Sequence, residues 1–460
     1  MSKKPERWRQ YYAAFTISIG AWGYGTVLGW PSNITNNLRA GELNGVKMTD
    51  TQLSWAGSVP TLGAMFSCLV IGFIADAIGR KTACFITLGP SILGWILILS
   101  AQNVEMVYSG RFLTGLGGGG FVVVAPVYTT EISETIIRGT CGLILQILLI
   151  FGVFYSNVMG WIFSVFFFNF SCLLVPILFG VLFIFQPETP FYYLEKGKKE
   201  EAEDSLRRLR GKDYDITEEI NYIIHLIEFR PERSFKTFVA AIRTKAQIKA
   251  TIICFMLMWY QKYSGVNVIV FYTKDVFIAS GIRMKEELGV ILTGGVGVLG
   301  TFVCVAAVDY FGRIALFVTS TFLCMTSTFC IGLFFHLKET WSMEDLNKVE
   351  FLPALGMILF LFSFNLGIGS IPWLSCSELW APSIKAKLGS VACAFNWSQA
   401  FVVSRYYFAV SSAIGIANTF FIFTLISCSS IFFVIFFIPE TKNKRYDEIL
   451  PGLEKFCTYC

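Results

Sequence analysis

The sequence has 460 residues, of which 54% are hydrophobic and 15% are charged, and its formal net charge is +5. Soluble domains carry about 25% charged residues, so this composition excludes an ordinary soluble protein and predicts one that lies in a lipid bilayer. The small positive charge gives no reason to expect a nucleic-acid partner.

Long apolar segments set the organisation of the chain. A helix needs about 20 mostly apolar residues to cross about 30 Å of hydrocarbon. Twelve segments meet this requirement, so we expect an all-α membrane protein with twelve transmembrane helices. In chain order they are 11–30, 53–75, 82–101, 105–128, 140–161, 165–186, 250–273, 288–308, 314–335, 351–376, 387–410 and 416–438.

Basic residues in the short loops predict the orientation. Lysine and arginine are retained on the cytosolic side of a membrane. The residues in question lie in both tails and in the turns after the second and fourth spans: Lys3, Lys4, Arg7, Arg9, Arg80, Lys81, Arg138, Lys442, Lys444 and Arg445. We therefore expect an integral membrane protein with both termini in the cytosol, and the plasma membrane as its location.

One long polar stretch, 187–249, separates the sixth span from the seventh. Its charges alternate in sign at helical spacing, and isoleucines near residue 223 form an apolar stripe, which favours short cytosolic helices over a disordered linker. Asp215 and Glu218 resemble a capping box. The predicted domains are a six-helix bundle at 1–186, the linker at 187–249, a second six-helix bundle at 250–438 and a cytosolic tail at 439–460.

The same short motifs occur in each half of the chain. GFIADAIGRK at 72–81 is repeated as AAVDYFGRI at 306–314, and a Pro-Glu-Thr triplet at 187–189 returns at 439–441. Because long apolar segments lie between these marks, the duplicated unit is a helical bundle. Two related bundles around a midplane site are how many transporters are built.

Charged residues recur at the inner end of both halves. They are Asp76, Arg80, Glu131 and Arg138 in the first half, and Asp309, Arg313, Glu378 and Lys385 or Lys387 in the second. Paired across helices, they predict two cytosolic latches that hold one conformation and release in the other. The alternative is simple solvation of charges next to the membrane.

Eight short motifs occur in order along almost the whole chain. They are GRK at 79–81, GRFLTGLGGG at 110–119, PVYTTEISE at 126–134, PETP at 187–190, QKYSGVN at 261–267, IPW at 371–373, NW at 396–397 and PETK at 439–442. With them the chain resembles the sugar porter family of the major facilitator superfamily. The GWP at 29–31 and FVVSR at 401–405 are similar to insect facilitated trehalose transporters. The resemblance implies two six-helix bundles and sugar transport, not an enzyme.

The resemblance also implies a sugar site. The matching positions are Gln146 on the fifth helix, Gln261 and Asn267 on the seventh, Trp373 on the tenth and Asn396 with Trp397 on the eleventh. Amides both donate and accept hydrogen bonds, as sugar hydroxyls do, and an indole covers the apolar face of a sugar ring. The alternative is that these polar groups pack membrane helices together.

The chain departs from the family pattern at several positions. Lys262 stands where the family commonly has a second glutamine, Gly297 and Ala400 stand where amides are common, and 367–370 lacks two prolines expected to soften the tenth helix. A charge in hydrocarbon normally faces a partner or a water-filled cavity. We therefore expect Lys262 to line the pathway with the other substrate-binding residues.

The first helix indicates whether transport is coupled to the movement of protons. Proton-coupled relatives usually carry an aspartate after the Gly-Tyr pair, whereas Gly25 follows Gly23 and Tyr24 here. This favours facilitated diffusion of a hexose or trehalose by alternating access, with the seventh helix closing through Phe271 and Tyr272. Two alternatives are a sugar receptor that does not transport, and a transporter of organic ions, for which Lys262 and Arg405 are the support.

Three further expectations complete the prediction. Asn33, Ile34 and Thr35 form a glycosylation sequon on the outer side. The chain shows no metal-spaced cluster, nucleotide loop or catalytic triad, so we expect no metal, cofactor or catalytic residue. The protein is expected to work as a monomer, with a small sugar and the lipid bilayer as its partners.

Overall fold

The computed structural model describes residues 5–228, 235–281, 285–442, 444, 448–449, 451 and 453. The side chains of residues 235–238, 309, 382–383 and 386 lie outside this description. Every regular element in the described part is a helix, so the expected all-α class is confirmed.

The first bundle contains six long helices. They are α1 (Arg7–Ala40), α2 (Asp50–Ile78), α3 (Arg80–Leu99), α4 (Val104–Ile132), α5 (Arg138–Ile162) and α6 (Val165–Phe183). Thr49 and Gln52 form a capping box at the start of α2. Helix α1 passes through Pro31 and continues beyond the predicted end at residue 30, because its last turns bury Ile34 and Leu38 and membrane helices tolerate proline.

The second bundle repeats this plan with interrupted helices. Its elements are α11 (Lys245–Gln261), the π-helix η1 (Lys262–Val266), α12 (Asn267–Ser280), α13 (Glu286–Phe311), α14 (Arg313–Thr340), α15 (Met343–Asn347), α16 (Leu352–Leu366), α17 (Ile371–Leu379), α18 (Pro382–Ile414) and α19 (Ile416–Phe437). Nine described helical segments are long and apolar enough to cross a membrane. Helix α1, the α11–η1–α12 run and α18 are three further long segments, which gives the expected twelve.

Four short helices connect the bundles. They are α7 (Pro190–Glu195), α8 (Lys199–Arg210), α9 (Thr217–Glu228) and α10 (Phe235–Ile242). The backbone N–H of Thr217 donates to Asp215 Oδ1 at 3.0 Å, a bond from position i+2 rather than the i+3 bond of a capping box, so that detail of the prediction is wrong.

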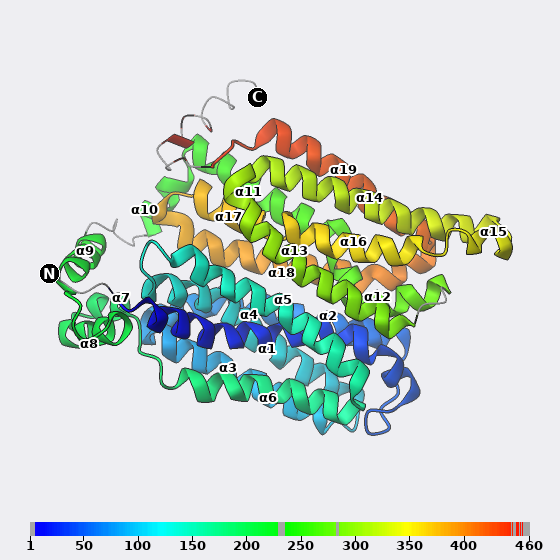
Figure 1. Cartoon of the computed structure of the whole chain (residues 1–460), viewed down its shortest axis with the longest axis horizontal. Coiled ribbons are helices and arrows are strands. Elements are labelled where there is room, and N and C mark those ends of the chain that lie inside the picture. Colours follow the sequence, from blue (N-terminus) through cyan, green and yellow to red (C-terminus); the bar gives the residue numbers. More distant parts are fainter. Residues whose placement is uncertain are drawn as a thin grey trace.

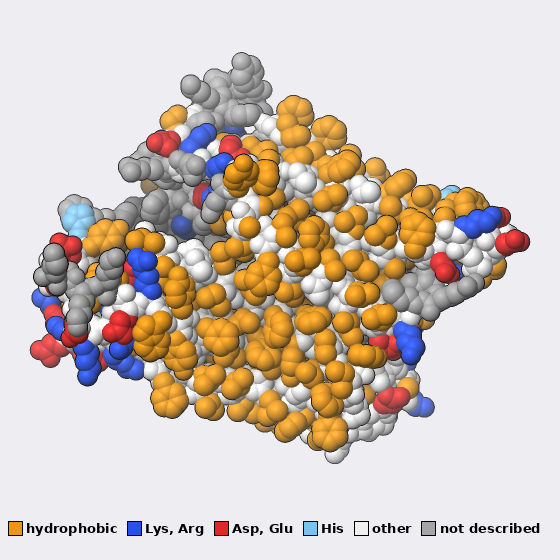
Figure 2. Space-filling model, viewed as in Figure 1, with side chains coloured by type: hydrophobic (Ala, Val, Ile, Leu, Met, Phe, Trp, Pro, Cys, Tyr) orange, Lys and Arg blue, Asp and Glu red, His pale blue; other side chains and the backbone are white. Residues whose placement is uncertain are grey.

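The molecule has two distinct ends. Figure 1 shows α7–α10 at one end, with the start of α1 and the end of α19, and α15 at the other. We call these the linker end and the α15 end. Figure 2 shows hydrophobic side chains covering the middle of the molecule, with charged side chains gathered at both ends. This is the pattern of a chain whose middle lies in hydrocarbon.

The seventh and tenth spans are both interrupted near their middle. In η1 the backbone of Gly265 has φ +98°, which favours glycine. Between α16 and α17 the chain turns at 367–370. The tenth span is therefore broken although it lacks the two prolines expected to soften it.

Glycines let α4 lie close to its neighbours in the first bundle. A Cβ on Gly115 would lie 2.0 Å from the Pro60 carbonyl oxygen of α2, and one on Gly118 would lie 1.8 Å from the Tyr24 ring of α1. Small residues allow this close approach of membrane helices. The glycine run of α4 thus sets the spacing of α1, α2 and α4.

We predict that Gly115→Ala destabilises the protein by about 1–3 kcal/mol, the usual cost of overpacking, because the new methyl group meets backbone that cannot rotate away. The matched control is Gly89→Ala on α3, where a Cβ would meet nothing within 4 Å. Thermal unfolding of both variants in detergent measures the difference. Equal melting temperatures for the two variants would contradict this account of the packing.

Candidate functional site

Gln261 joins three helices at the middle of the second bundle. Its side chain is 2% exposed, and its Nε2 donates to the carbonyl oxygens of Ile368 at 3.1 Å and Gly369 at 2.8 Å. Its Oε1 accepts from Asn396 Nδ2 at 2.8 Å. The structure therefore brings two of the predicted sugar-binding residues into direct contact, beside the break between α16 and α17.

The next residue after each of these two, Lys262 after Gln261 and Trp397 after Asn396, forms a second contact. The Lys262 Nζ lies 5.0 Å from the centre of the Trp397 ring, and Trp397 meets Tyr24 of the first bundle edge to face at 5.4 Å. Both Lys262 and Trp397 are buried. This contact therefore lies where the two bundles meet.

Several buried polar atoms of this region have no hydrogen-bond partner among the described residues. They are Tyr24 Oη, Asn267 Oδ1, Asn396 Oδ1 and Trp397 Nε1. Buried polar groups are normally satisfied, so unsatisfied atoms mark a place where a polar ligand or water is expected. Both acceptors and donors are present among them, as sugar hydroxyls require.

Gln146 and Trp373 come from opposite bundles and are less enclosed. Gln146 of α5 is half-buried, and Trp373 of α17 is 36% exposed. Gly142 of α5 and Gly389 of α18 border open space, since a Cβ on either would meet nothing within 4 Å. Gly142 and Gly389 lie near the start of α5 (Arg138–Ile162) and α18 (Pro382–Ile414), toward the linker end.

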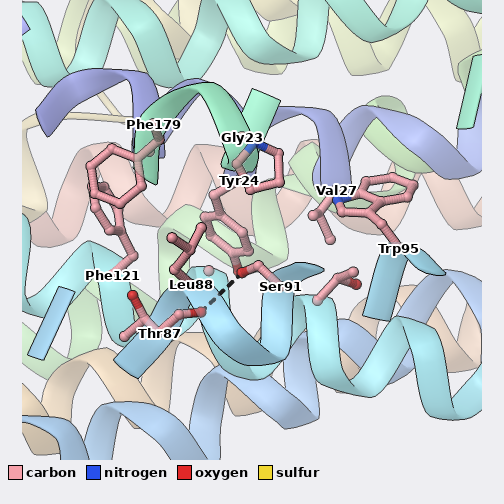
Figure 3. A pocket seen from close by; sticks show the side chains of 13 residues that line it. Gly23, Tyr24, Val27, Thr87, Leu88, Ser91, Trp95, Phe121 and Phe179 are labelled. Atoms are coloured by element: carbon pink, nitrogen blue, oxygen red, sulfur yellow. Dashed lines mark hydrogen bonds between the residues drawn. The ribbon is translucent and has the colours of Figure 1, made fainter. Parts of the chain in front are cut away.

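A cavity inside the first bundle is too small to hold a sugar. Figure 3 shows it between Tyr24, Thr87, Ser91, Phe121 and Phe179. Its volume is about 20 Å³, which is room for about one water molecule. The cavity shares Tyr24 with the region around Gln261, because the same ring contacts Trp397.

Three of the residues predicted for the first latch, Asp76, Arg80 and Glu131, lie together at the linker end. Arg80 Nη2 lies 3.0 Å from Glu131 Oε1 and 3.5 Å from Asp76 Oδ1. The Pro-Glu-Thr triplet completes it: Thr189 Oγ1 donates to Glu131 Oε2 at 2.6 Å, and Glu188 accepts the backbone N–H of Lys81 at 2.9 Å. Arg138 is not part of this cluster; its Nη2 reaches only the Ser133 carbonyl, at 3.5 Å.

The second half repeats this geometry. Arg313 Nη2 lies 2.8 Å from Glu378 Oε1, and Thr441 Oγ1 donates to Glu378 Oε2 at 2.5 Å. Glu440 accepts the backbone N–H groups of Arg313 and Ile314 at 3.1 and 3.0 Å. The side chain of Asp309 lies outside the described residues. Each latch therefore links helices within one bundle, and the triplet glutamate and threonine are members that we did not predict, although the repeated triplet signalled them.

The pKa values of the two triplet glutamates, Glu188 and Glu440, shift in opposite directions. Burial raises the pKa of Glu188, and the backbone N–H groups that it accepts do not fully offset this. Burial also disfavours the charged form of Glu440, but backbone N–H groups from residues 442, 314, 313 and 441 outweigh it and lower the pKa of that carboxyl. The surroundings of Glu440 in the second half thus favour the charged carboxylate more strongly than the surroundings of Glu188 in the first half.

The α15 end is closed by contacts between the bundles. Arg39 of α1 lies 2.8 Å from Asp275 of α12 and 2.9 Å from Asp50 of α2. Ser54 Oγ of α2 donates to the Arg405 carbonyl of α18 at 2.6 Å. These contacts were not predicted, because the partners on α1 and α12, like those on α2 and α18, lie far apart in the chain.

Phe271 and Tyr272, the predicted closing residues, lie in the same part of the molecule. Both are 1% exposed, and Tyr272 has a non-helical backbone with φ −126° inside α12. Its hydroxyl donates to the Ser404 carbonyl at 3.0 Å, and its ring stacks on Tyr407. A Cβ on Gly57 of α2 would lie 3.1 Å from the same hydroxyl, so Tyr272 bridges the two bundles.

Asn33, the predicted glycosylation site, lies inside helix α1. Its Nδ2 donates to the Gly29 carbonyl at 2.8 Å and to Asn157 Oδ1 at 2.9 Å, and Thr35 Oγ1 donates to the Pro31 carbonyl. A glycan on Nδ2 would replace one of its two hydrogens, so at least one of these two bonds would be lost. This conformation therefore does not present Asn33 as an acceptor.

Two six-helix bundles with repeated ion-pair junctions and a polar midplane define a membrane transporter of the two-bundle type. The chain belongs to the family described as "Sugar (and other) transporter", which matches residues 11–452. The family is one of transporters, so the chain is not an enzyme.

The chain is similar to insect proteins named facilitated trehalose transporter Tret1. It is 31% identical to that of Bombyx mori over 450 residues, covering 96% of this chain and 86% of the relative. It is 32% identical to that of Apis mellifera ligustica over 454 residues, covering 98% and 89%. Against the Aedes aegypti protein the identity is 31% over 442 residues, covering 96% of this chain, which spans about half of that relative (55%).

Solved structures share the fold. The inward open conformation of the xylose transporter XylE from E. coli superposes with a TM-score of 0.78 at 19% identity, covering 96% of this chain and 98% of that one. A second structure, of the major facilitator superfamily proton:xylose symporter XylE bound to 6-bromo-6-deoxy-D-glucose, gives 0.77 at 19% identity, with 96% and 98% covered. The predicted major facilitator fold is confirmed.

The triplet glutamates give a prediction about pH and stability. A carboxyl whose pKa is lowered by folding stabilises the protein above its ordinary pKa of about 4.3, and loses this effect as the pH falls through the lowered pKa. A carboxyl whose pKa is raised by folding destabilises the protein at high pH, and this cost disappears as the pH falls through the raised pKa. Near pH 7 we therefore expect Glu440→Gln to lower the melting temperature by several degrees, and Glu188→Gln to lower it less or to raise it.

The measurement is thermal unfolding of both variants in detergent near pH 7 and at successively lower pH. Wild type should gain stability relative to Glu188→Gln as the pH falls toward the raised pKa, because the cost of the charged form disappears. Equal losses in both variants at every pH would show that the two junctions do not differ in this way.

Proposed function

We propose that this chain moves a hexose or trehalose across a membrane by facilitated diffusion. The observation that carries the proposal is the contact of Gln261 with Asn396, with unsatisfied polar atoms of Asn267 and Asn396 in the same region. The names of the trehalose transporter relatives agree with this substrate class.

Facilitated diffusion is favoured over proton coupling by the packing around position 25. A Cβ on Gly25 would lie 2.1 Å from the Leu149 carbonyl oxygen of α5, so α1 and α5 leave no room for a carboxylate there. Arg111, the buried arginine of α4, donates instead to the carbonyls of Ala56 and Val27. An intramembrane acid that gains and loses a proton is what coupling would need.

Alternating access is supported by the asymmetry of the two ends. Contacts between the bundles close the α15 end through Arg39 and Asp275, whereas the described ion pairs of the two latches stay within single bundles. We infer that the bundles at 1–186 and 250–438 move as units about the midplane, with the linker at 187–249 between them. Because these ion pairs lie inside single bundles, we propose that they keep each bundle rigid while it moves, in place of the release between conformations expected from the sequence.

The proposed setting follows the charge distribution. We propose that the linker end and both tails face the cytosol, and that the protein works as a monomer in the plasma membrane. The basic residues at the linker end support this orientation. Of the alternative readings, the organic-ion transporter loses Arg405 as support, because its Nη1 bonds Ser54 at 3.2 Å and its guanidinium covers Trp55 at the α15 end.

The transport proposal predicts saturable entry of labelled glucose or trehalose into liposomes that hold the purified protein, without a proton gradient. Gln146→Ala should raise the half-saturating concentration about 2- to 10-fold, the worth of one lost neutral hydrogen bond. Gln102→Ala changes an exposed amide and should leave entry unchanged. Entry that requires a proton gradient would overturn facilitated diffusion, and sugar binding without any entry would favour a receptor.

The closure at the α15 end gives a separate prediction. Asp275→Asn removes the charge that holds Arg39, so the α15 end should open more often. Hydroxyl-radical footprinting should then modify Tyr272 several-fold faster, because this ring is 1% exposed in the closed form. Asp50→Asn is the matched control: Asp50 is 67% exposed, and such surface pairs contribute about 0–1 kcal/mol. Equal rates of Tyr272 modification in the two variants would show that Asp275 does not hold the α15 end closed.

A further inference from the structure

Lys262 carries a buried ammonium group for which no described residue supplies an ion pair or a hydrogen bond. The residue is 9% exposed, and its Nζ contacts the face of the Trp397 ring at 5.0 Å. It makes no hydrogen bond or ion pair with another described residue. An ammonium has three donors, and the indole face occupies one side of it only, so a purely structural role leaves those donors unused.

The carboxylates of the described bundles are already engaged elsewhere. Asp275 is bound by Arg39 at the α15 end, while Glu131 and Glu378 are bound by arginines at the linker end. No described carboxylate lies within ion-pair distance of Lys262. A cation held in low dielectric attracts an anion strongly, so an anion that binds beside Lys262 comes from outside the described carboxylates and replaces water there.

Another cation buried inside the first bundle, Arg111, offers a comparison. Arg111 donates to the carbonyls of Ala56 and Val27 and lies over the Trp30 ring at 4.4 Å. Its Nε and Nη1 are thus satisfied by helix backbone, while its Nη2 has no partner among the described residues. Lys262 has no such bonds, and it lies next to Gln261 in the sugar-binding region.

Unsatisfied polar atoms on the two chain segments that carry Lys262 and its Trp397 contact indicate what accompanies the anion. Trp397 Nε1 is a buried donor without a partner, and Asn396 Oδ1 and Asn267 Oδ1 are buried acceptors without partners. The acceptors suit hydroxyl hydrogens, and the indole N–H suits a hydroxyl or carboxylate oxygen. One positive group beside several hydroxyl-binding atoms matches a sugar that carries one negative charge.

We propose that the site takes a monosaccharide with a single carboxylate, a uronate or an aldonate, whose carboxylate lies beside Lys262 and whose hydroxyls meet Asn267 and Asn396. This inference rests on the proposed transport function and names its substrate class. A phosphate monoester would bring about two negative charges near neutral pH against one lysine, so the carboxylate is the better match.

The experiment uses the full-length protein in liposomes with labelled glucuronate and labelled glucose. Wild type is compared with Lys262→Gln, which restores the neutral amide, and with Lys262→Arg, which keeps the charge. Lys212→Gln removes an exposed charge in the linker and is the matched control. We expect wild type to take up glucuronate, Lys262→Gln to weaken its uptake about 10- to 100-fold, and Lys262→Arg and Lys212→Gln to retain it.

The charge of the substrate supplies a second readout. Carrying a monoanion without a co-ion moves one charge per cycle, so an inside-positive potential of about 60 mV should raise the final glucuronate accumulation about 10-fold. Glucose accumulation should not respond. Glucuronate uptake that ignores both the potential and the Lys262→Gln change would overturn the inference.

Failure of this inference is distinguishable from failure of the transport proposal. If glucose enters equally through wild type and Lys262→Gln while glucuronate neither enters nor competes, the acidic-sugar inference is wrong and transport stands. If neither sugar enters, transport fails, and tryptophan fluorescence still decides the binding question. Quenching by glucuronate that is lost in Lys262→Gln supports the acidic site, and its absence in wild type overturns it.

Discussion

A helix broken inside hydrocarbon leaves backbone carbonyls that no water can satisfy, and the second bundle answers this constraint with one side chain. Gln261 donates to the carbonyls of Ile368 and Gly369 and accepts from Asn396. The amide therefore links the break in the tenth span, the π-helix of the seventh and the helix α18. A leucine at this position would leave two carbonyls without donors, so the polar midplane depends on this residue before any ligand arrives.

Duplication gave the two halves the same junction, but the environments of the junctions have diverged. In both, an arginine pairs with a helix-end glutamate, a threonine hydroxyl holds the second oxygen of that glutamate, and a triplet glutamate caps the next helix. Burial dominates at Glu188, whereas backbone donors dominate at Glu440. Conserved geometry thus leaves room for different charge preferences, because the pKa of a carboxyl depends on everything packed around it.

The sequence predicted what periodicity and repetition control. Apolar runs located the twelve spans, and the repeated motifs grouped Arg80 with Glu131, which form an ion pair, although they also grouped Arg138, which stays outside it. The extension of α1 past Pro31, the π-helix after Gln261 and the pairing of Arg39 with Asp275 were not predicted. These features depend on partners far away in the chain, and a single sequence contains no pattern that reports such contacts.

The structural use of Gln261 also bears on how binding moves the protein. Both ends of its amide are already bonded, so a sugar hydroxyl that takes its Nε2 must displace a carbonyl of Ile368 or Gly369. The freed carbonyl then needs a new donor, which the turn between α16 and α17 can find only by moving. A ligand shifts a conformational equilibrium only by differential contacts with the two states. When a sugar hydroxyl replaces one of these carbonyls as the partner of the Gln261 amide, the two states differ in this way. Binding at the midplane is thereby connected to the position of α17. The end of α17 carries Glu378, which belongs to the second latch.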